Sequence, residues 1–253
     1  MTAPAPRLVA FDLDDTLAPS KSAIDPRMGA LLVALAERVT VAIISGGRLE
    51  QFTAQVVDRL PAAGPETLAN FHLLPACGTQ YYRIRPHGIE TVYALDLAAG
   101  RRAAATAVFE EEARRLGLWE ETTWGDVIED RGSQITFSAL GQQAPLDAKA
   151  AWDPTGEKRN ALSAAVAARL PDLEVRSGGS TSIDVTERGI DKAYGMRRLV
   201  EQTGIPLDDM LFVGDRLDPA GNDYPVLAMG VECHAVTGWE STAEFLEGLL
   251  PRL

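Results

Sequence analysis

The sequence predicts an α/β protein with a doubly wound, Rossmann-like core into which an α+β unit is inserted. Apolar, β-branched runs alternate with amphipathic helical segments up to about residue 80 and again from about residue 188, a pattern typical of parallel sheets with crossover helices. Between these stretches the pattern changes to a turn-linked hairpin and alternating strands. We therefore expect a catalytic core made of residues 1–80 and 188–253, and an inserted domain made of residues 81–187.

The core elements follow from local signals. Asp25-Pro26 predicts a helix start, because Asp is a favoured N-cap and Pro is favoured at the first helical position. Short apolar runs predict buried strands at residues 8–11, 39–44, 71–74, 210–213 and 231–236. Helical periodicity predicts further helices at residues 49–60, at 191–203 and from 241 onwards.

The inserted domain is expected to begin with a hairpin. Residues 81–84 and 89–95 flank Pro86-His87-Gly88, a turn signal between two strand-like runs. A long helix at 98–116 should follow, and then a strand at 134–140, a helix at 157–170 and strands at 173–176 and 181–185.

Charge and composition exclude several function classes. The 253 residues carry a net charge of −12, which argues against nucleic acid or an anionic membrane surface as a partner, because both require a basic face. No apolar stretch is long enough to span a bilayer, and the N-terminus lacks a signal-peptide pattern. We expect a cytoplasmic enzyme acting on a small molecule, and the sequence leaves open whether it is a monomer or a homodimer.

The stretch Asp12-Leu13-Asp14-Asp15-Thr16 directly follows the first predicted strand. Ligands of open α/β sheets bind at the carboxyl ends of the strands. Three carboxylates within four residues repel one another unless a cation neutralises them, and Mg²⁺ prefers such oxygen ligands. The alternative is a solvated turn or a helix cap.

Other polar groups also follow strands or begin helices, and together they fit phosphoryl transfer through an aspartyl phosphate. Asp12 would be the nucleophile and a metal ligand. Asp14 would be the general acid and base, with its backbone carbonyl available to the metal. Asp215 would complete the metal site, and Asn222 and Asp223 would support it.

Two further groups would bind the phosphoryl oxygens. Ser45, Gly46 and Gly47 follow the second strand and offer a hydroxyl and backbone amides at a glycine-rich turn. Lys192 would place a compact positive charge against both the nucleophile and the phosphate. Only four of the 24 basic residues are lysines, so a lysine at this position is informative.

These motifs identify the sequence as similar to the haloacid dehalogenase superfamily, whose signature DxDx[TV] is matched by residues 12–16. Ser45, Lys192 and Gly214-Asp215 with Asn222-Asp223 match its other motifs in order. The insertion resembles the α+β cap of IIB-type sugar phosphatases and of eukaryotic-type phosphomannomutases. The likeness to the mutases extends over Ile128 to Arg131, Gly178 to Val185 and Gly189 to Lys192.

The resemblance implies that the insertion binds a sugar phosphate. Arg131, Ser182 and Asp184 match cap positions that hold the sugar phosphate and its hydroxyls, and Lys21 lies where the mutases place an arginine. Two cap positions depart from the mutases, because Gln142 and Lys149 stand where the mutases carry phosphate-binding arginines. Asp15 also occupies the usual Gly position of the mutase signature.

Losing a guanidinium weakens the grip on a second phosphate, so we expect a Mg²⁺-dependent hexose-phosphate phosphatase. The alternative is a phosphomannomutase-type enzyme that needs a hexose bisphosphate activator. A more distant alternative is a phosphate-sensing binding module, since receiver domains also surround a phosphorylatable Asp with acidic, hydroxyl and lysine groups. Such domains carry no cap.

Overall fold

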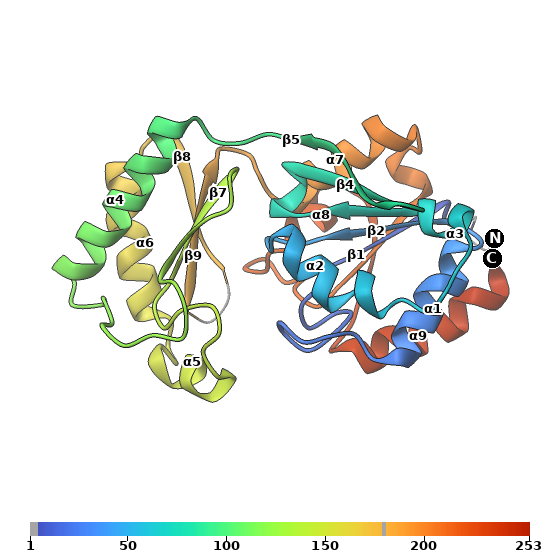
Figure 1. Cartoon of the computed structure of the whole chain (residues 1–253), viewed down its shortest axis with the longest axis horizontal. Coiled ribbons are helices and arrows are strands. Elements are labelled where there is room, and N and C mark those ends of the chain that lie inside the picture. The colour runs from blue at the N-terminus through green and yellow to red at the C-terminus, as the bar shows by residue number, and fades with distance from the viewer. Residues whose placement is uncertain (1–4, 179–180) are drawn as a thin grey trace. The chain divides into compact units, whose positions relative to one another are not determined.

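The computed structural model describes residues 5–178 and 181–253. The chain divides into two compact units: residues up to 94 together with 191–253 form the core unit, and residues 95–190 form the inserted unit (Figure 1). No helix in the described part of the chain has both the length and the apolar character needed to cross a bilayer.

The core unit contains a seven-stranded sheet in the order β11-β10-β1-β2-β3-β4-β5 (Figure 1). Its strands are β1 (Leu8–Phe11), β2 (Thr40–Ile44), β3 (Phe71–Leu74), β4 (Gln80–Arg85), β5 (Gly88–Ala94), β10 (Met210–Gly214) and β11 (Glu232–Ala235). The first five in spatial order run parallel. β4 runs antiparallel to β3, and β5 runs antiparallel to β4. The predicted Rossmann-like sheet is therefore confirmed, with a hairpin added at one edge.

Helices cover both faces of this sheet. Val9 and Phe11 pack into one hydrophobic cluster with α1 (Pro26–Ala36), α2 (Leu49–Gln55) and α9 (Trp239–Leu249). Leu8 and Ala10 pack into a second cluster with α7 (Lys192–Thr203) and α8 (Tyr224–Ala228). Alternate residues of β1 thus enter opposite cores, which explains why the whole strand is apolar. Short helices α3 (Pro65–Ala69), η1 (Val57–Arg59), η2 (Ala76–Gly78), η3 (Leu207–Asp209) and η4 (Leu250–Arg252) complete the unit.

The first boundary of the inserted domain was predicted wrongly. The hairpin at residues 80–94 belongs to the core unit, where His72 of β3 pairs with Arg83 of β4. Tyr81 is fully buried there. A hairpin pattern fixes the pairing of two neighbouring strands, but it does not determine which sheet edge they join. The second boundary lies at 190/191, three residues beyond the expected position.

The inserted unit is an antiparallel sheet in the order β6-β7-β9-β8 with two long helices (Figure 1). Its strands are β6 (Ile128–Asp130), β7 (Gln134–Ser138), β8 (Leu173–Ser177) and β9 (Ser182–Glu187), and its helices are α4 (Ala99–Arg115), α5 (Leu146–Trp152) and α6 (Glu157–Arg169). Ile135, Phe137, Ile183 and Val185 form an apolar sheet face that packs with α4 and α6. Gln134, Thr136, Ser138, Ser182 and Asp184 alternate with them and form the polar face.

His72 makes the stability of the core unit depend on pH. Burial lowers the pKa of His72 to about 3, and Arg83 and Arg85 add to the shift. Its Nδ1 lies 2.5 Å from the hydroxyl oxygen of Tyr81. The folded state therefore holds His72 neutral, whereas the unfolded chain takes up a proton below the usual pKa of 6.5.

We expect the contribution of His72 to be fully present above pH 6.5 and to fall as the pH decreases, by about 2 kcal/mol at pH 5. Urea unfolding of wild type and His72→Gln at neutral pH and at pH 5 measures it, because the variant lacks the titrating ring. Equal losses of unfolding free energy in both proteins would contradict this assignment.

Candidate active site

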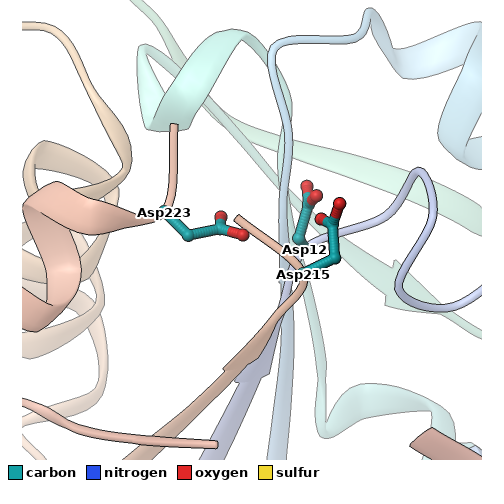
Figure 2. Close-up of side chains that lie close together, drawn as sticks. All are labelled: Asp12, Asp215 and Asp223. Atoms are coloured by element: carbon teal, nitrogen blue, oxygen red, sulfur yellow. The ribbon is translucent and has the colours of Figure 1, made fainter. Parts of the chain in front are cut away.

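Three carboxylates meet at the carboxyl edge of the core sheet. Asp12 follows β1, Asp215 follows β10, and Asp223 precedes α8. Each offers one oxygen, and these oxygens all lie within 4.8 Å of one another. Figure 2 shows the Asp12 and Asp215 carboxylates side by side, with that of Asp223 directed toward them from its loop.

Lys192 joins two of these carboxylates. Its Nζ lies 2.6 Å from Oδ1 of Asp12 and 2.5 Å from Oδ1 of Asp223. The lysine is only 1% exposed, so all three charges are removed from water. The attraction of Lys192 for the two carboxylates offsets a desolvation cost that would be prohibitive for any one of the three charges alone.

The pKa values reflect this crowding. Burial raises the pKa of Asp12 to about 8; Lys192 opposes the rise and Asp223 adds to it. Burial and then the charge of Asp223 also raise the pKa of Asp215. Burial alone would lower the pKa of Lys192, but the charges of Asp12 and Asp223 outweigh it and raise that pKa. The lysine therefore stays protonated.

A hard divalent cation fits this donor set. Three convergent carboxylates face one lysine, so the cluster carries more negative than positive charge when ionised. Mg²⁺ prefers carboxylate oxygens and is commonly bound by few of them. Asp12, Asp215 and Asp223 are the residues that would hold it. Asp223 was expected only to support the site, yet its carboxylate is part of the cluster, whereas Asn222 is exposed.

The loop after β10 is shaped to hold Asp223. The Arg216 backbone N–H donates to Asp223 Oδ2 over 3.0 Å, and the Asp223 N–H donates to the Arg216 carbonyl. A Cβ at Gly214 would lie 2.4 Å from Asp223 Oδ2. Residue 214 must therefore be glycine for this carboxylate to reach the cluster.

Lys192 is placed by the first turn of α7. Asp191 caps that helix, with its side chain accepting a hydrogen bond from the Tyr194 N–H. A Cβ at Gly78 would lie 2.7 Å from the Cα of Gly195, so the helix packs backbone to backbone against η2. This close packing fixes the first turn of α7 against the core unit, and Lys192 on that turn is buried.

Asp14 is held apart from the carboxylate cluster. Its Oδ1 accepts the Lys21 backbone N–H over 2.7 Å, and its Oδ2 accepts Nε2 of Gln51 over 2.9 Å. The expectation that its backbone carbonyl reaches the metal stays a prediction. Asp15, which replaces the usual Gly, has φ of +61°, a region that Asp tolerates better than most residues.

The turn after β2 has the features of a phosphate cradle. The Ser45 hydroxyl accepts the Gly47 N–H over 3.2 Å, and the serine is buried. A Cβ at Gly46 would meet nothing within 4 Å, so the backbone there borders open space. The turn therefore leaves room at Gly46 for a small anion beside the Ser45 hydroxyl.

The predicted sugar-binding residues are all in the inserted unit, apart from Lys21. Arg131 is bound by Glu129, with 2.7 Å between Nη2 and Oε2, and both side chains are 10% exposed. Gln142 donates from Nε2 to Ser138 Oγ over 2.5 Å, and Lys149 Nζ donates to the Gln142 carbonyl over 3.0 Å. These contacts join Gln142 and Lys149 in one local network.

Ser182 and Asp184 lie on the polar face of the inserted sheet, beside Ser138 and Thr136 of β7. Ser182 Oγ is 3.0 Å from Ser138 Oγ, and Asp184 Oδ1 accepts the Thr136 hydroxyl over 2.7 Å. In the segment from Gly178 to Val185 that resembles the mutases, Gly179 and Ser180 lie outside the described residues.

Sequence reasoning missed three side chains at this site. Thr16 Oγ1 is 3.4 Å from Asp215 Oδ1, and Gln51 and Gln55 both donate to Asp14. The only available signal for the glutamines was their i, i+4 spacing on a helix that directly follows the Ser45 turn.

Comparisons with known proteins identify the family to which the chain is similar. The family model described as eukaryotic phosphomannomutase matches residues 119–251, more than half of the chain. A probable phosphomannomutase of Caenorhabditis elegans is 24% identical over the full length of both chains, and Homo sapiens phosphomannomutase 1 is 25% identical over 87% of this chain and 83% of its own.

Solved structures show the same fold at low identity. A haloacid dehalogenase-like hydrolase from Bacteroides thetaiotaomicron superposes with a TM-score of 0.65 at 17% identity, over 96% of this chain and 99% of its own. A C-terminally truncated Plasmodium falciparum IMP-nucleotidase gives a TM-score of 0.74 at 14% identity, over 98% and 72%. The chain belongs to the eukaryotic phosphomannomutase family of phosphoryl-transfer enzymes.

Proposed function

We propose that this protein is a Mg²⁺-dependent phosphatase of hexose phosphates that acts through a phosphoryl-Asp12 intermediate. The observation that carries the chemistry is the buried cluster in which Lys192 bridges Asp12 and Asp223. A metal bound there would offset the repulsion between the Asp12 carboxylate and the phosphoryl oxygens.

In the first half of the reaction, Asp12 attacks the phosphorus and the bond to the sugar oxygen breaks. Lys192 and the turn at Ser45, Gly46 and Gly47 bind the phosphoryl oxygens. Asp14 gives its proton to the departing sugar oxygen, so that a neutral hydroxyl leaves.

In the second half, Asp14 has lost its proton and can accept one. It removes a proton from the incoming water, which attacks the phosphorus and returns Asp12 to its carboxylate form. Arg131, Ser182 and Asp184, with Lys21 and Lys149, bind the sugar phosphate.

Hydrolysis is favoured over mutation by the side chain at position 142. A mutase must hold the non-reacting phosphate of a bisphosphate, and Gln142 offers an amide that already donates to Ser138. A hydrogen bond to a charged group contributes about 1.5 to 3 kcal/mol, so a missing guanidinium weakens such binding roughly tenfold or more.

Family membership favours a second candidate, a hexose-phosphate mutase with a hexose bisphosphate activator, because the matched relatives carry the name phosphomannomutase. One assay separates the two. Hexose 1- and 6-phosphates are supplied with MgCl₂, with and without a hexose bisphosphate, and free phosphate and isomerised sugar are measured separately. Phosphate release without activator supports the phosphatase, and isomerisation that depends on the bisphosphate refutes it.

Gln142→Arg should strengthen hexose bisphosphate binding about tenfold, because a guanidinium adds a charged, bidentate donor. Calorimetric titration of the bisphosphate measures the change. Gln143→Arg is the matched control, since it adds the same charge at an exposed neighbour. Equal affinities in Gln142→Arg and wild type would show that position 142 does not face the second phosphate.

A further inference from the structure

Helix α2 supplies two amide donors to the same carboxylate. Gln51 Nε2 donates to Asp14 Oδ2 over 2.9 Å, and Gln55 Nε2 donates to Asp14 Oδ1 over 3.3 Å. The two glutamines are one helical turn apart, so their side chains project from the same face of α2. With the Lys21 N–H, they place three donors on one carboxylate that lies outside the metal cluster.

The surroundings of Gln51 are built around this contact. A Cβ at Gly47 would lie 2.3 Å from Gln51 Oε1, so any larger residue at position 47 would displace the glutamine. The same side chain thus touches Asp14 through its nitrogen and lies against the turn that we assign to phosphate binding. Gln55 is 4% exposed and also donates to the Ser22 carbonyl over 2.7 Å, which ties the loop after Asp14 to the helix.

We propose that Gln51 is a positioning residue for proton transfer. It holds the Asp14 carboxylate in the orientation needed to give a proton to the leaving sugar oxygen and to take one from the attacking water. The proposal rests on the proposed phosphoryl transfer through Asp12. An amide suits the task, because its directed N–H donor fixes the position of one carboxylate oxygen.

The role of Asp14 differs between substrates, which provides a sharp test. p-Nitrophenyl phosphate has a leaving group that departs without protonation, whereas a sugar oxygen needs a proton from Asp14. Breakdown of phosphoryl-Asp12 needs Asp14 as a base whichever substrate formed it. A loss of Asp14 positioning therefore slows breakdown in every case, but slows formation only with the sugar phosphate.

The experiment uses the full chain with MgCl₂ and compares wild type with Gln51→Met. A rapid-mixing burst of p-nitrophenolate reports formation of the phosphoenzyme, and loss of the labelled phosphoryl group, with and without added hexose phosphate, reports its breakdown. For Gln51→Met we expect an unchanged burst rate, breakdown slower by roughly 10-fold to 100-fold, and a lower kcat for hexose phosphate with little change in KM. Gln51→Glu should be slower still, because it places a second carboxylate against Asp14.

Glu50→Met is the matched control, since Glu50 is exposed on the same helix and its Oε2 is 3.7 Å from Nε of Arg48. A breakdown rate equal to wild type in Gln51→Met overturns the proposal, and so does an equal fall in burst and breakdown rates, which would indicate a general structural defect. If wild type forms no phosphoenzyme from either substrate, the proposed function fails and the inference fails with it, an outcome distinct from the other two.

Discussion

We expect the Asp12→Asn variant to lose turnover of its phosphate substrate by a factor on the order of 10⁴ or more. An amide is a poor nucleophile, and the nearby Asp14 carboxylate is held by Lys21 and Gln51, outside the cluster. The fold should persist, because burial already disfavours the Asp12 charge, which raises its pKa to about 8. Intact-mass analysis should find the phosphoryl adduct in wild type after mixing with substrate and none in the variant.

Asp208→Asn serves as the control for this prediction, since Asp208 is an exposed carboxylate of the core unit. Circular dichroism and urea unfolding should place both variants close to wild type. Turnover retained by a folded Asp12→Asn protein would refute the aspartyl-phosphate scheme.

The second large effect is expected for Lys192→Met, in both activity and stability. The substitution leaves Asp12 and Asp223 buried side by side without their cation, at a cost of about 3 kcal/mol. Asp12 then relieves the repulsion by binding a proton, so its pKa rises further above the usual value. Because the folded state holds that proton more tightly than the unfolded chain, the variant should be more stable near pH 6 than near pH 8.

Urea unfolding of Lys192→Met at these two pH values, with and without MgCl₂, measures the effect. Added Mg²⁺ should recover part of the lost stability by replacing the missing positive charge. Lys158→Met is a suitable control, because Lys158 is exposed on α6 of the inserted unit. A loss of stability that is independent of both pH and Mg²⁺ would indicate a packing defect in place of the charge imbalance.

The central part of the site was predictable because its residues share one topological rule. Asp12, Ser45 and Asp215 each follow a buried parallel strand, and such strand ends lie along one edge of a sheet. The structure brings Asp12, Asp215 and Lys192 together, as the sequence pattern predicts. The positions of strand ends can be predicted without knowing any side-chain conformation. Local sequence patterns were therefore sufficient to predict that these residues lie close together.

The direct part played by Asp223 could not be predicted in this way. Its place in the cluster depends on the path of the 214–223 loop, which is fixed by the Arg216 backbone and by the space that Gly214 leaves. These contacts lie within an irregular segment, where no hydrophobic periodicity of the sequence indicates the direction of the chain. The β4–β5 hairpin was misplaced for a similar reason, since its partner strand β3 is chosen by tertiary pairing.

Gln51 and Gln55 show a third limit. Both lie on a helix that was predicted to run to residue 60 but ends at Gln55 before a short 3₁₀ turn. On an amphipathic helix a glutamine is ordinarily solvated, and nothing in the sequence distinguishes one that binds a carboxylate. The chain that follows Asp14 is irregular as well, with left-handed conformations at Asp15 and Lys21.

The central strand of the core has a consequence for synthesis of the protein. β1 lies between β2 and β10, and Leu8 is aligned with Met210 across one of these pairings. In the order of synthesis, β1 and β2 therefore precede the inserted unit, whereas β10, Lys192 and Asp215 follow it. We infer that an emerging chain holds β1 with one edge unpaired until the residues that follow the inserted unit have been translated, because pairings so distant in sequence form late.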